Sequence, residues 1–171
     1  LNLAENTNFD AYMESDAFTN ISNAAKSSAR YVTYQEFLGN NNEVINLRVT
    51  KSGTADTTSN YSYGYIALRS DTTFSHIANS GQAFWQTSNY ANSTGTSQTM
   101  NGVFYLFNFA SASDYSFVTN ETANLTGSDL LIGAQGGGVH TVASASDGLS
   151  FHYSADNIAS GRFVLYGLKK E

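Results

Sequence analysis

The chain of 171 residues contains no cysteine and no proline, and it carries little charge. Without cysteine there can be no disulfide, no thiolate metal ligand and no cysteine nucleophile. Without proline, the edges of any β-sheet must be protected by other means, such as short edge strands, lysines or Asn-rich loops. Charged residues make up 13% of the sequence, about half of the usual ~25%.

Positive charge is particularly scarce. Eight Lys and Arg residues face fourteen Asp and Glu residues, which gives a net charge of −6. A groove that follows a phosphate backbone needs clustered cations, so we expect no nucleic-acid partner. No hydrophobic run approaches the ~18 residues of a membrane-spanning helix, and there is no signal-like segment, so we expect no membrane insertion. Because the sequence begins with Leu1, we expect a processed product or the ordered part of a longer protein.

Aromatic and small polar residues take the place of charge. Aromatics reach 13%, with 11 Tyr and 11 Phe. Tyr, Phe, Thr and Val favour strands, whereas the abundant Asn, Ser and Gly favour turns. The length fits one domain of ~100–150 residues with a short appendage. The composition therefore predicts a single all-β domain.

From Arg30 onward the hydrophobic pattern has a period of two. Ile45, Leu47 and Val49 alternate with polar residues, and so do the tyrosines of the segment 61–65. The segment Val103–Phe109 is apolar on nearly both faces, which predicts the most central strand. The segment from Phe74 to Trp85 predicts two short strands around Asn79-Ser80-Gly81.

The run Gly136-Gly137-Gly138 lacks the Lys-Ser/Thr of a phosphate-binding loop and predicts a flexible hairpin tip. Strands are predicted on both sides of it, at 130–134 and 139–143, and others at 31–38, 115–119, 149–153 and 163–168. No helical pattern of useful length separates them, which argues against a parallel sheet. We therefore predict an antiparallel β-sandwich or jelly roll of about eight to ten strands over residues 29–171.

Residues 1–28 differ from the remainder. Phe9, Tyr12 and Met13 indicate one weak helical face, and the polar stretch 20–28 is typical of a linker. We expect a short N-terminal arm, either packed on a neighbouring subunit or forming a loose extension of the sandwich.

The end of the chain carries a distinctive motif. A segment of the form Asn-Ile-x-Ser-Gly, at 157–161, is followed by a strand that closes on Leu165-Tyr166-Gly167-Leu168-Lys169. This ending resembles one that recurs in structural proteins of tailed phages, including tail fibre and receptor-binding components. Upstream segments are similar in order and spacing, so the resemblance covers about residues 30–171 and is most specific at the closing motif.

The resemblance implies a jelly-roll module on the surface of a virion. It implies other virion proteins as partners and a homo-oligomer, with a trimer favoured over other states. Binding of a host-surface glycan stays an open alternative for such a module. In physical terms, Gly161 is expected to supply a turn and Phe163 and Leu165 to fill one face of the closing strand. These residues determine a fold, so the motif identifies a module without identifying a ligand.

The sequence offers little for catalysis or metal binding. His76, His140 and His152 lack the spacing of a zinc motif, and there is no Gly-x-Ser-x-Gly elbow. The carboxylates mostly fall in predicted turns, where Asp bonds to backbone; those considered are Asp56, Asp71, Asp114, Glu121, Asp129, Asp147 and Asp156. A calcium ion near Asp147 or Asp156 stays an open alternative, without the ligand spacing of a defined loop. We predict no enzyme, no cofactor and no metal.

Sugar binding is the remaining chemical possibility. Trp85 and Tyr90 flank the long polar loop 86–99, where a ring beside Asn and Ser side chains suits the face of a pyranose. The alternative for Trp85, which we favour, is a place in the core. Asn-x-Ser/Thr sequons occur at Asn20, Asn60, Asn92, Asn120 and Asn124, as is expected by chance in so polar a chain.

Taken together, the sequence predicts a non-enzymatic structural protein of a phage virion, as part of a tail fibre or spike or as a capsid decoration. Two alternatives stay open: a carbohydrate-binding module of a secreted protein and, less favoured, a polysaccharide depolymerase.

Overall fold

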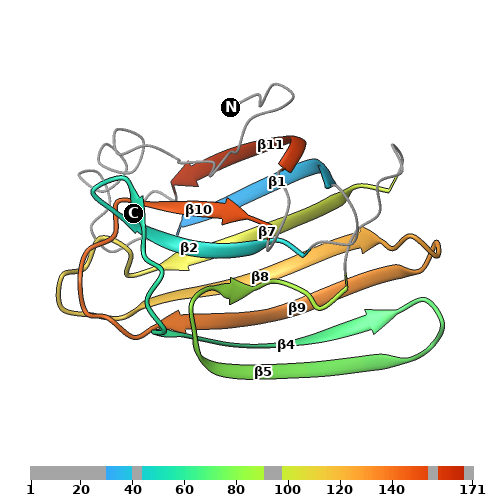
Figure 1. Cartoon of the computed structure of the whole chain (residues 1–171), viewed down its shortest axis with the longest axis horizontal. Coiled ribbons are helices and arrows are strands. Elements are labelled where there is room, and N and C mark those ends of the chain that lie inside the picture. The colour runs from blue at the N-terminus through green and yellow to red at the C-terminus, as the bar shows by residue number, and fades with distance from the viewer. Residues whose placement is uncertain (1–29, 40–43, 91–97, 154–157, 168–171) are drawn as a thin grey trace.

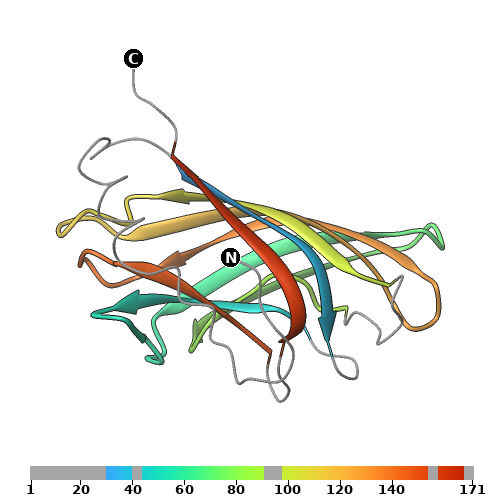
Figure 2. The same ribbon diagram turned by 90° about the horizontal axis from the view of Figure 1, so that it is seen from above.

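The computed structural model describes residues 30–39, 44–90, 98–153 and 158–167. In these ranges the regular secondary structure consists of strands alone, and the strands form two antiparallel sheets (Figures 1 and 2). None of the described residues forms a helix long and apolar enough to cross a membrane. The predicted all-β antiparallel sandwich is confirmed. The proposed arm, residues 1–28, lies outside the described residues.

The larger sheet has seven strands in the order β11-β1-β7-β8-β9-β4-β5. In chain order they are β1 (Arg30–Gly39), β4 (Tyr61–Arg69), β5 (Phe74–Gln82), β7 (Met100–Phe107), β8 (Ser116–Leu125), β9 (Leu131–His140) and β11 (Ile158–Gly167). Figure 1 shows β11 and β5 at opposite edges of this sheet.

The smaller sheet is built around β2 (Asn46–Lys51). This strand pairs along its length with β10 (Gly148–His152). Near its two ends it also pairs with two very short strands, β3 (Thr54–Ala55) and β6 (Trp85–Gln86). The smaller sheet therefore covers only part of the larger one.

The connectivity contains more hairpins than a jelly roll requires. In the larger sheet, β4 and β5, β7 and β8, and β8 and β9 are neighbours both in space and along the chain. A jelly roll is built from two Greek keys, in which long connections bring distant strands together. The sandwich is thus established, whereas jelly-roll connectivity is not.

Strict alternation of buried and exposed residues explains how the larger sheet forms. In β8 every even-numbered residue from Ser116 to Asn124 is buried and every odd-numbered one from Phe117 to Ala123 is exposed. In β4 the predicted shared face of Tyr61, Tyr63 and Tyr65 is confirmed, because all three are buried. One face of this sheet therefore contributes to the core and the other faces outward.

Two predicted strand assignments are wrong. The glycines 136–138 form no hairpin tip but lie inside β9, paired on one side with β8 and on the other with β4. The segment 74–82 is one strand, β5, and Asn79-Ser80-Gly81 adjoins a register shift within it, with Gly81 at a φ of 64°. In both places glycine serves close approach or a local irregularity instead of a turn.

The prediction of the most central strand is also wrong. The middle position of the larger sheet belongs to β8, and β7 lies one place toward β11. Strand β7 is apolar on both faces although only one of them is buried. Phe104 and Leu106 lie in the core, while Tyr105 and Phe107 are exposed on the outward face.

The closing strand lies at one edge of the larger sheet, where β11 pairs with β1. Phe163 is buried and Leu165 packs against the core, as predicted. Gly161 forms no turn. It lies within β11, opposite the register shift between Gln35 and Leu38 of β1.

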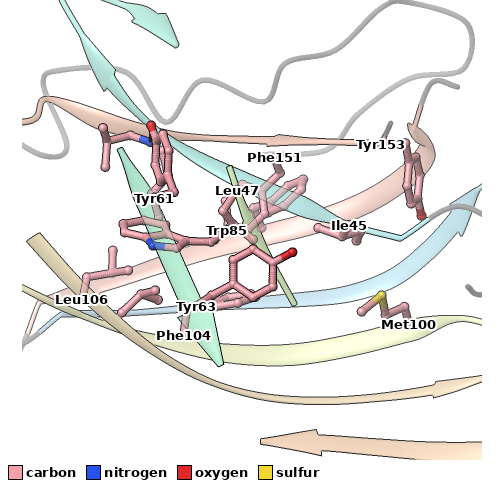
Figure 3. Close-up of a cluster of buried hydrophobic side chains, with 14 of the residues drawn as sticks. Ile45, Leu47, Tyr61, Tyr63, Trp85, Met100, Phe104, Leu106, Phe151 and Tyr153 are labelled. Carbon is pink, nitrogen blue, oxygen red and sulfur yellow. Dashed lines mark hydrogen bonds between the residues drawn. The ribbon is translucent and has the colours of Figure 1, made fainter. Parts of the chain in front are cut away.

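The main core lies between the two sheets (Figure 3). Two aromatic groups dominate it. Trp85 meets the ring of Tyr61 edge-on with the ring centroids 5.2 Å apart, and it also contacts Phe109. Phe151 of the smaller sheet packs against both Phe104 and Phe163 of the larger one, with the ring centroids 5.8 and 4.6 Å away. These ring contacts hold the two sheets together.

Candidate functional site

Trp85, one of the two predicted sugar-binding residues, lies in the core. Its side chain is 2% exposed and packs between Tyr61, Phe109 and His140 (Figure 3 labels the first of these). On β9, the Cβ of any residue other than glycine at position 138 would lie 2.5 Å from Trp85 Cδ1. The indole thus occupies space that this glycine leaves, and its ring faces are not available for stacking on a sugar. The core alternative for Trp85 is confirmed.

Tyr90, the second predicted residue, is half-buried at the surface and packs on a small separate cluster that contains Ala67 and Ile132. Arg69 Nη1 donates a 3.0 Å hydrogen bond to the Tyr90 hydroxyl, which itself donates to Ser75 Oγ at 3.4 Å. The guanidinium carbon of Arg69 is 5.1 Å from the centroid of the Tyr90 ring.

A carboxylate completes this group, which we call the Tyr90 cluster: Arg69, Asp71, Ser75 and Tyr90. Arg69 Nη2 and Asp71 Oδ2 are 2.6 Å apart. The hydrogen bonds with Ser75 and Arg69 lower the pKa of Tyr90. Those that Arg69 donates to Tyr90 and Asp71 raise the pKa of the guanidinium. The Tyr90 ring lies beside a cation, an anion and a hydroxyl. These polar groups are suited to hydrogen bonds with the hydroxyl groups of a sugar. The sequence indicated Tyr90 alone, because the other members come from β4, β5 and the turn between them.

The outward face of the larger sheet carries a second candidate surface. Tyr105, Phe107, Tyr115, Phe117 and Tyr166 form what we call the aromatic patch, and each is between 38% and 46% exposed. Phe107 and Phe117 are directly opposite each other on β7 and β8. Tyr105 and Tyr166 share one row of the sheet, because both pair with position 31 of β1. Members of the aromatic patch therefore lie on β8, on β7 and, beyond β1, on the closing strand β11.

A smaller apolar group lies across the same face. Ile66, Leu68, Phe74 and Leu131 are all exposed and come from β4, β5 and β9. Between this group and the aromatic patch, Gln135 donates a 2.9 Å hydrogen bond to Glu121. The outward face thus presents two apolar areas with a polar pair between them.

A buried histidine, His140, lies beside a partly buried aspartate, Asp56. His140 is completely buried, and its Nε2 lies 3.3 Å from Asp56 Oδ2 without the alignment of a hydrogen bond. Asp56 also pairs with Lys51 Nζ at 3.2 Å and accepts hydrogen bonds from Thr58. Rings of Tyr61 and Trp85 enclose the imidazole. Because no substrate can reach His140 in this arrangement, we interpret the pair as structural.

This pair makes stability depend on pH. Burial lowers the pKa of His140, and the attraction of Asp56 offsets only part of that effect. Burial acts to raise the pKa of Asp56, but hydrogen bonds from Thr58 and Lys51 outweigh it and lower the value from 3.8 to about 2. Both groups therefore take up protons more readily in the unfolded chain, so acid favours unfolding.

We expect two stages of destabilisation on acidification. The contribution of His140 is lost as the pH falls below about 6.5, the ordinary value for histidine, and that of Asp56 as it falls from about 4 toward 2. The urea midpoint measured between pH 7.5 and 5 should fall in the wild type and fall less in His140→Phe. His76→Gln, at an exposed position, is the control and should keep the wild-type slope. An unchanged slope in His140→Phe would contradict this account.

Some of the aspartates have the local partners predicted for turns, whereas Asp147 bonds to a distant segment. Asp71 accepts from Thr73 and Asp114 accepts from Ser111. Asp147, one of the two residues considered for calcium, accepts from Thr50 Oγ1 at 2.6 Å and from the Gly53 amide at 3.0 Å. Asp156 lies outside the described residues. Within those residues, no group of three or more His, Cys, Asp or Glu side chains could hold a metal ion.

Two of the sequons are incompatible with glycosylation of the folded domain. Asn120 and Asn124 lie on the buried face of β8, where their side-chain amides donate to the carbonyls of Thr87 and Tyr90. A glycan on either nitrogen would have to pass through the interior. The chance origin expected for the sequons agrees with this placement. Asn20 and Asn92 lie outside the described residues.

In comparisons with known proteins, no family model, no curated protein and no solved structure matches this chain.

Proposed function

We propose that this protein is a non-enzymatic structural module of a tailed-phage virion, as part of a tail fibre or spike or as a capsid decoration. The aromatic patch is the observation that carries the proposal. Several exposed aromatics on one face of a sheet are typical of surfaces that become buried against a partner. The resemblance of the closing motif to phage proteins supplies the biological setting, and the patch includes Tyr166 of that motif.

The patch has the composition of an interface anchor. Tyr and Phe bury large areas with few rotatable bonds, so a partner that covers them gains much apolar contact at a small entropic cost. The chain carries few charges, which also suits packing against neighbours in a dense assembly. We therefore assign other virion proteins as the partners of this face.

Removing the two central rings should prevent assembly without unfolding the domain. Phe107 and Phe117 are exposed, so changing both to Ser is expected to alter the unfolding midpoint little. A tagged copy supplied during infection should be incorporated into particles, whereas the tagged Phe107→Ser/Phe117→Ser variant should be incorporated roughly tenfold less or worse, as for a loss of ~1.4 kcal/mol in association.

Leu68→Ser provides the matched control, because Leu68 is 60% exposed on the same face but outside the aromatic patch. It should enter particles as the wild type does. Equal incorporation of the double variant and the wild type would remove the assigned role of the patch. If no tagged protein enters particles at all, the virion assignment itself fails.

A second candidate function is binding of a host-surface glycan, which the Tyr90 cluster favours. Trp85→Ala is unsuitable as a test because Trp85 is a core residue. On a glycan array, Tyr90→Ala should lose a signal that Tyr115→Ala, another aromatic change at the surface, retains. If the wild type gives no signal, the carbohydrate-binding role fails while the assembly role stands.

A further inference from the structure

The two edges of the larger sheet are protected differently. At one edge β11 carries Arg162, and its pairing with β1 contains two register shifts. At the other edge β5 has nine residues, Phe74–Gln82, of which none is Lys, Arg, Asp, Glu or Pro. Edge strands normally carry such residues, or a bulge, to prevent pairing with another chain. In β5 the only register shift lies at its end, beyond Asn79, so the segment 74–79 is a regular and uncharged edge.

The hydrogen bonds of the β4–β5 hairpin identify which backbone groups face outward. The amide of Arg69 donates to the carbonyl of Thr73 at 3.0 Å, so these two residues form a hydrogen-bonded pair. Such pairs alternate along antiparallel strands. Ser75 and Ile77 therefore bond to β4, and among the residues the structure describes no strand pairs with the other side of β5. The amides and carbonyls of Phe74, His76 and Ala78 point to this open edge.

The side chains of the same three residues lie on the outward face. Phe74 is opposite Leu68, His76 is opposite Ile66 and Ala78 is opposite Gly64. All three are exposed, and Phe74 is the most exposed large hydrophobic residue described, at 65%. Beside Ala78, a Cβ built on Gly64 would touch only Ile77 O and Ala78 Cβ, at 3.6 and 3.7 Å. Ala78 and Gly64 thus leave a shallow area at the other end of the strand from Phe74.

We propose that β5 pairs with β5 of a second copy of this chain, antiparallel about a two-fold axis through His76. This register pairs Phe74 of each copy with Ala78 of the other and His76 with its own copy. It uses every outward backbone group of the regular segment, and it places each Phe74 ring over the small Ala78 and Gly64 of the other copy. Bulk at one end and open space at the other make the strand complementary to itself.

Charge also favours a second copy at this edge. Two chains of net charge −6 repel each other, so they can associate most easily through a surface without acidic residues. The regular part of β5 is such a surface. The interface involves one strand per copy, which places it in the class of small, weak interfaces. We therefore expect only part of the protein to be dimeric at concentrations of ~100 µM or lower. The proposal does not depend on the virion assignment.

Sedimentation velocity of the full chain at about 100 µM tests the proposal. The wild type should contain a species of twice the 18.4 kDa mass. His76→Lys places two like charges directly opposite each other at the axis and should weaken the dimer roughly tenfold or more. Ala78→Pro removes an amide that is outward in the monomer but bonded in the dimer, so it should prevent pairing while the monomer folds. Thr119→Lys adds the same charge at an exposed position of β8 and should leave the dimer unchanged.

Hydrogen exchange provides the second measurement. The amides of Phe74, His76 and Ala78 should exchange slowly in the wild-type dimer and fast in His76→Lys, whereas those of Ser75 and Ile77 should be protected in both. A strict monomer, a trimer, or a dimer that survives both His76→Lys and Ala78→Pro would overturn the proposal. A dimer that Thr119→Lys disrupts would place the contact on the sheet face instead. If a variant loses its unfolding transition, the exchange pattern of the wild type alone decides.

Discussion

Changing Gly138 to alanine is expected to lower the free energy of unfolding by about 3 kcal/mol, the upper part of the range for overpacking a core. The new Cβ would lie 2.5 and 2.7 Å from two atoms of the Trp85 ring and 2.8 Å from the carbonyl oxygen of Ser62. Neither neighbour can move easily, because Trp85 is wedged between Tyr61 and Phe109 and the carbonyl belongs to β4. Urea unfolding followed by Trp85 fluorescence measures the loss.

The same strand offers a matched control. A Cβ at Gly133 would have nothing within 4 Å, and its φ is not positive, so Gly133→Ala should be neutral or stabilise by up to ~1 kcal/mol. Shrinking the neighbour should also relieve the clash. Gly138→Ala combined with Trp85→Leu, compared with each single change by circular dichroism, should be less destabilised than the sum of the two. Similar losses at positions 133 and 138 would show that the glycine is not needed for close approach.

Phe151→Ala is the second change with a large expected effect, a loss of about 3–5 kcal/mol. The side chain is fully buried on β10 and is the ring that contacts both Phe104 of β7 and Phe163 of β11. Its removal leaves a cavity at the contact between the sheets. Thermal and urea unfolding of the purified variant measure the effect.

Tyr115→Ala removes an aromatic ring of similar size from the surface and should change stability by no more than ~0.5 kcal/mol. A double-mutant cycle of Phe151→Ala with Phe163→Ala should give a coupling of about 0.5–1.5 kcal/mol, because the two rings are in contact. Loss of less than ~1 kcal/mol in Phe151→Ala would mean that this ring does not hold the sheets together.

The sequence predicts the fold class well wherever apolar and polar residues alternate locally. The pattern correctly predicts the buried faces of the β4 tyrosines and of Ile45, Leu47 and Val49, because each of these patterns lies within one segment. For β9 the same pattern predicts two strands instead of one, because a run of glycines carries no side chains that could mark a buried or an exposed face. Glycine is needed at position 138 because the Trp85 ring fills the space of a Cβ there, and Trp85 lies 53 residues earlier in the chain (138 minus 85). A pattern within one segment cannot show such a contact.

The same limit applies to the candidate sites: the sequence indicates single residues, and the fold supplies their partners. The sequence indicates Tyr90 because of the conspicuous polar loop around it. Its partner Arg69, which also pairs with Asp71, approaches it only through the hairpin of β4 and β5. Two members of the aromatic patch, Tyr105 and Phe107, belong to the apolar run of β7, from which the sequence predicts burial on both faces. Exposure depends on whether another layer covers the strand, and the smaller sheet covers the other side.

The central claim is that the domain assembles into a virion through the aromatic patch. Cryo-electron microscopy of particles purified from the source culture, with the chain identified by mass spectrometry of its peptides, tests it most directly. We predict copies of this sandwich at a repeated position, with Phe107 and Phe117 buried against a neighbouring virion protein. Absence of the chain from the particles, or copies whose Phe107 and Phe117 face solvent, would contradict the claim.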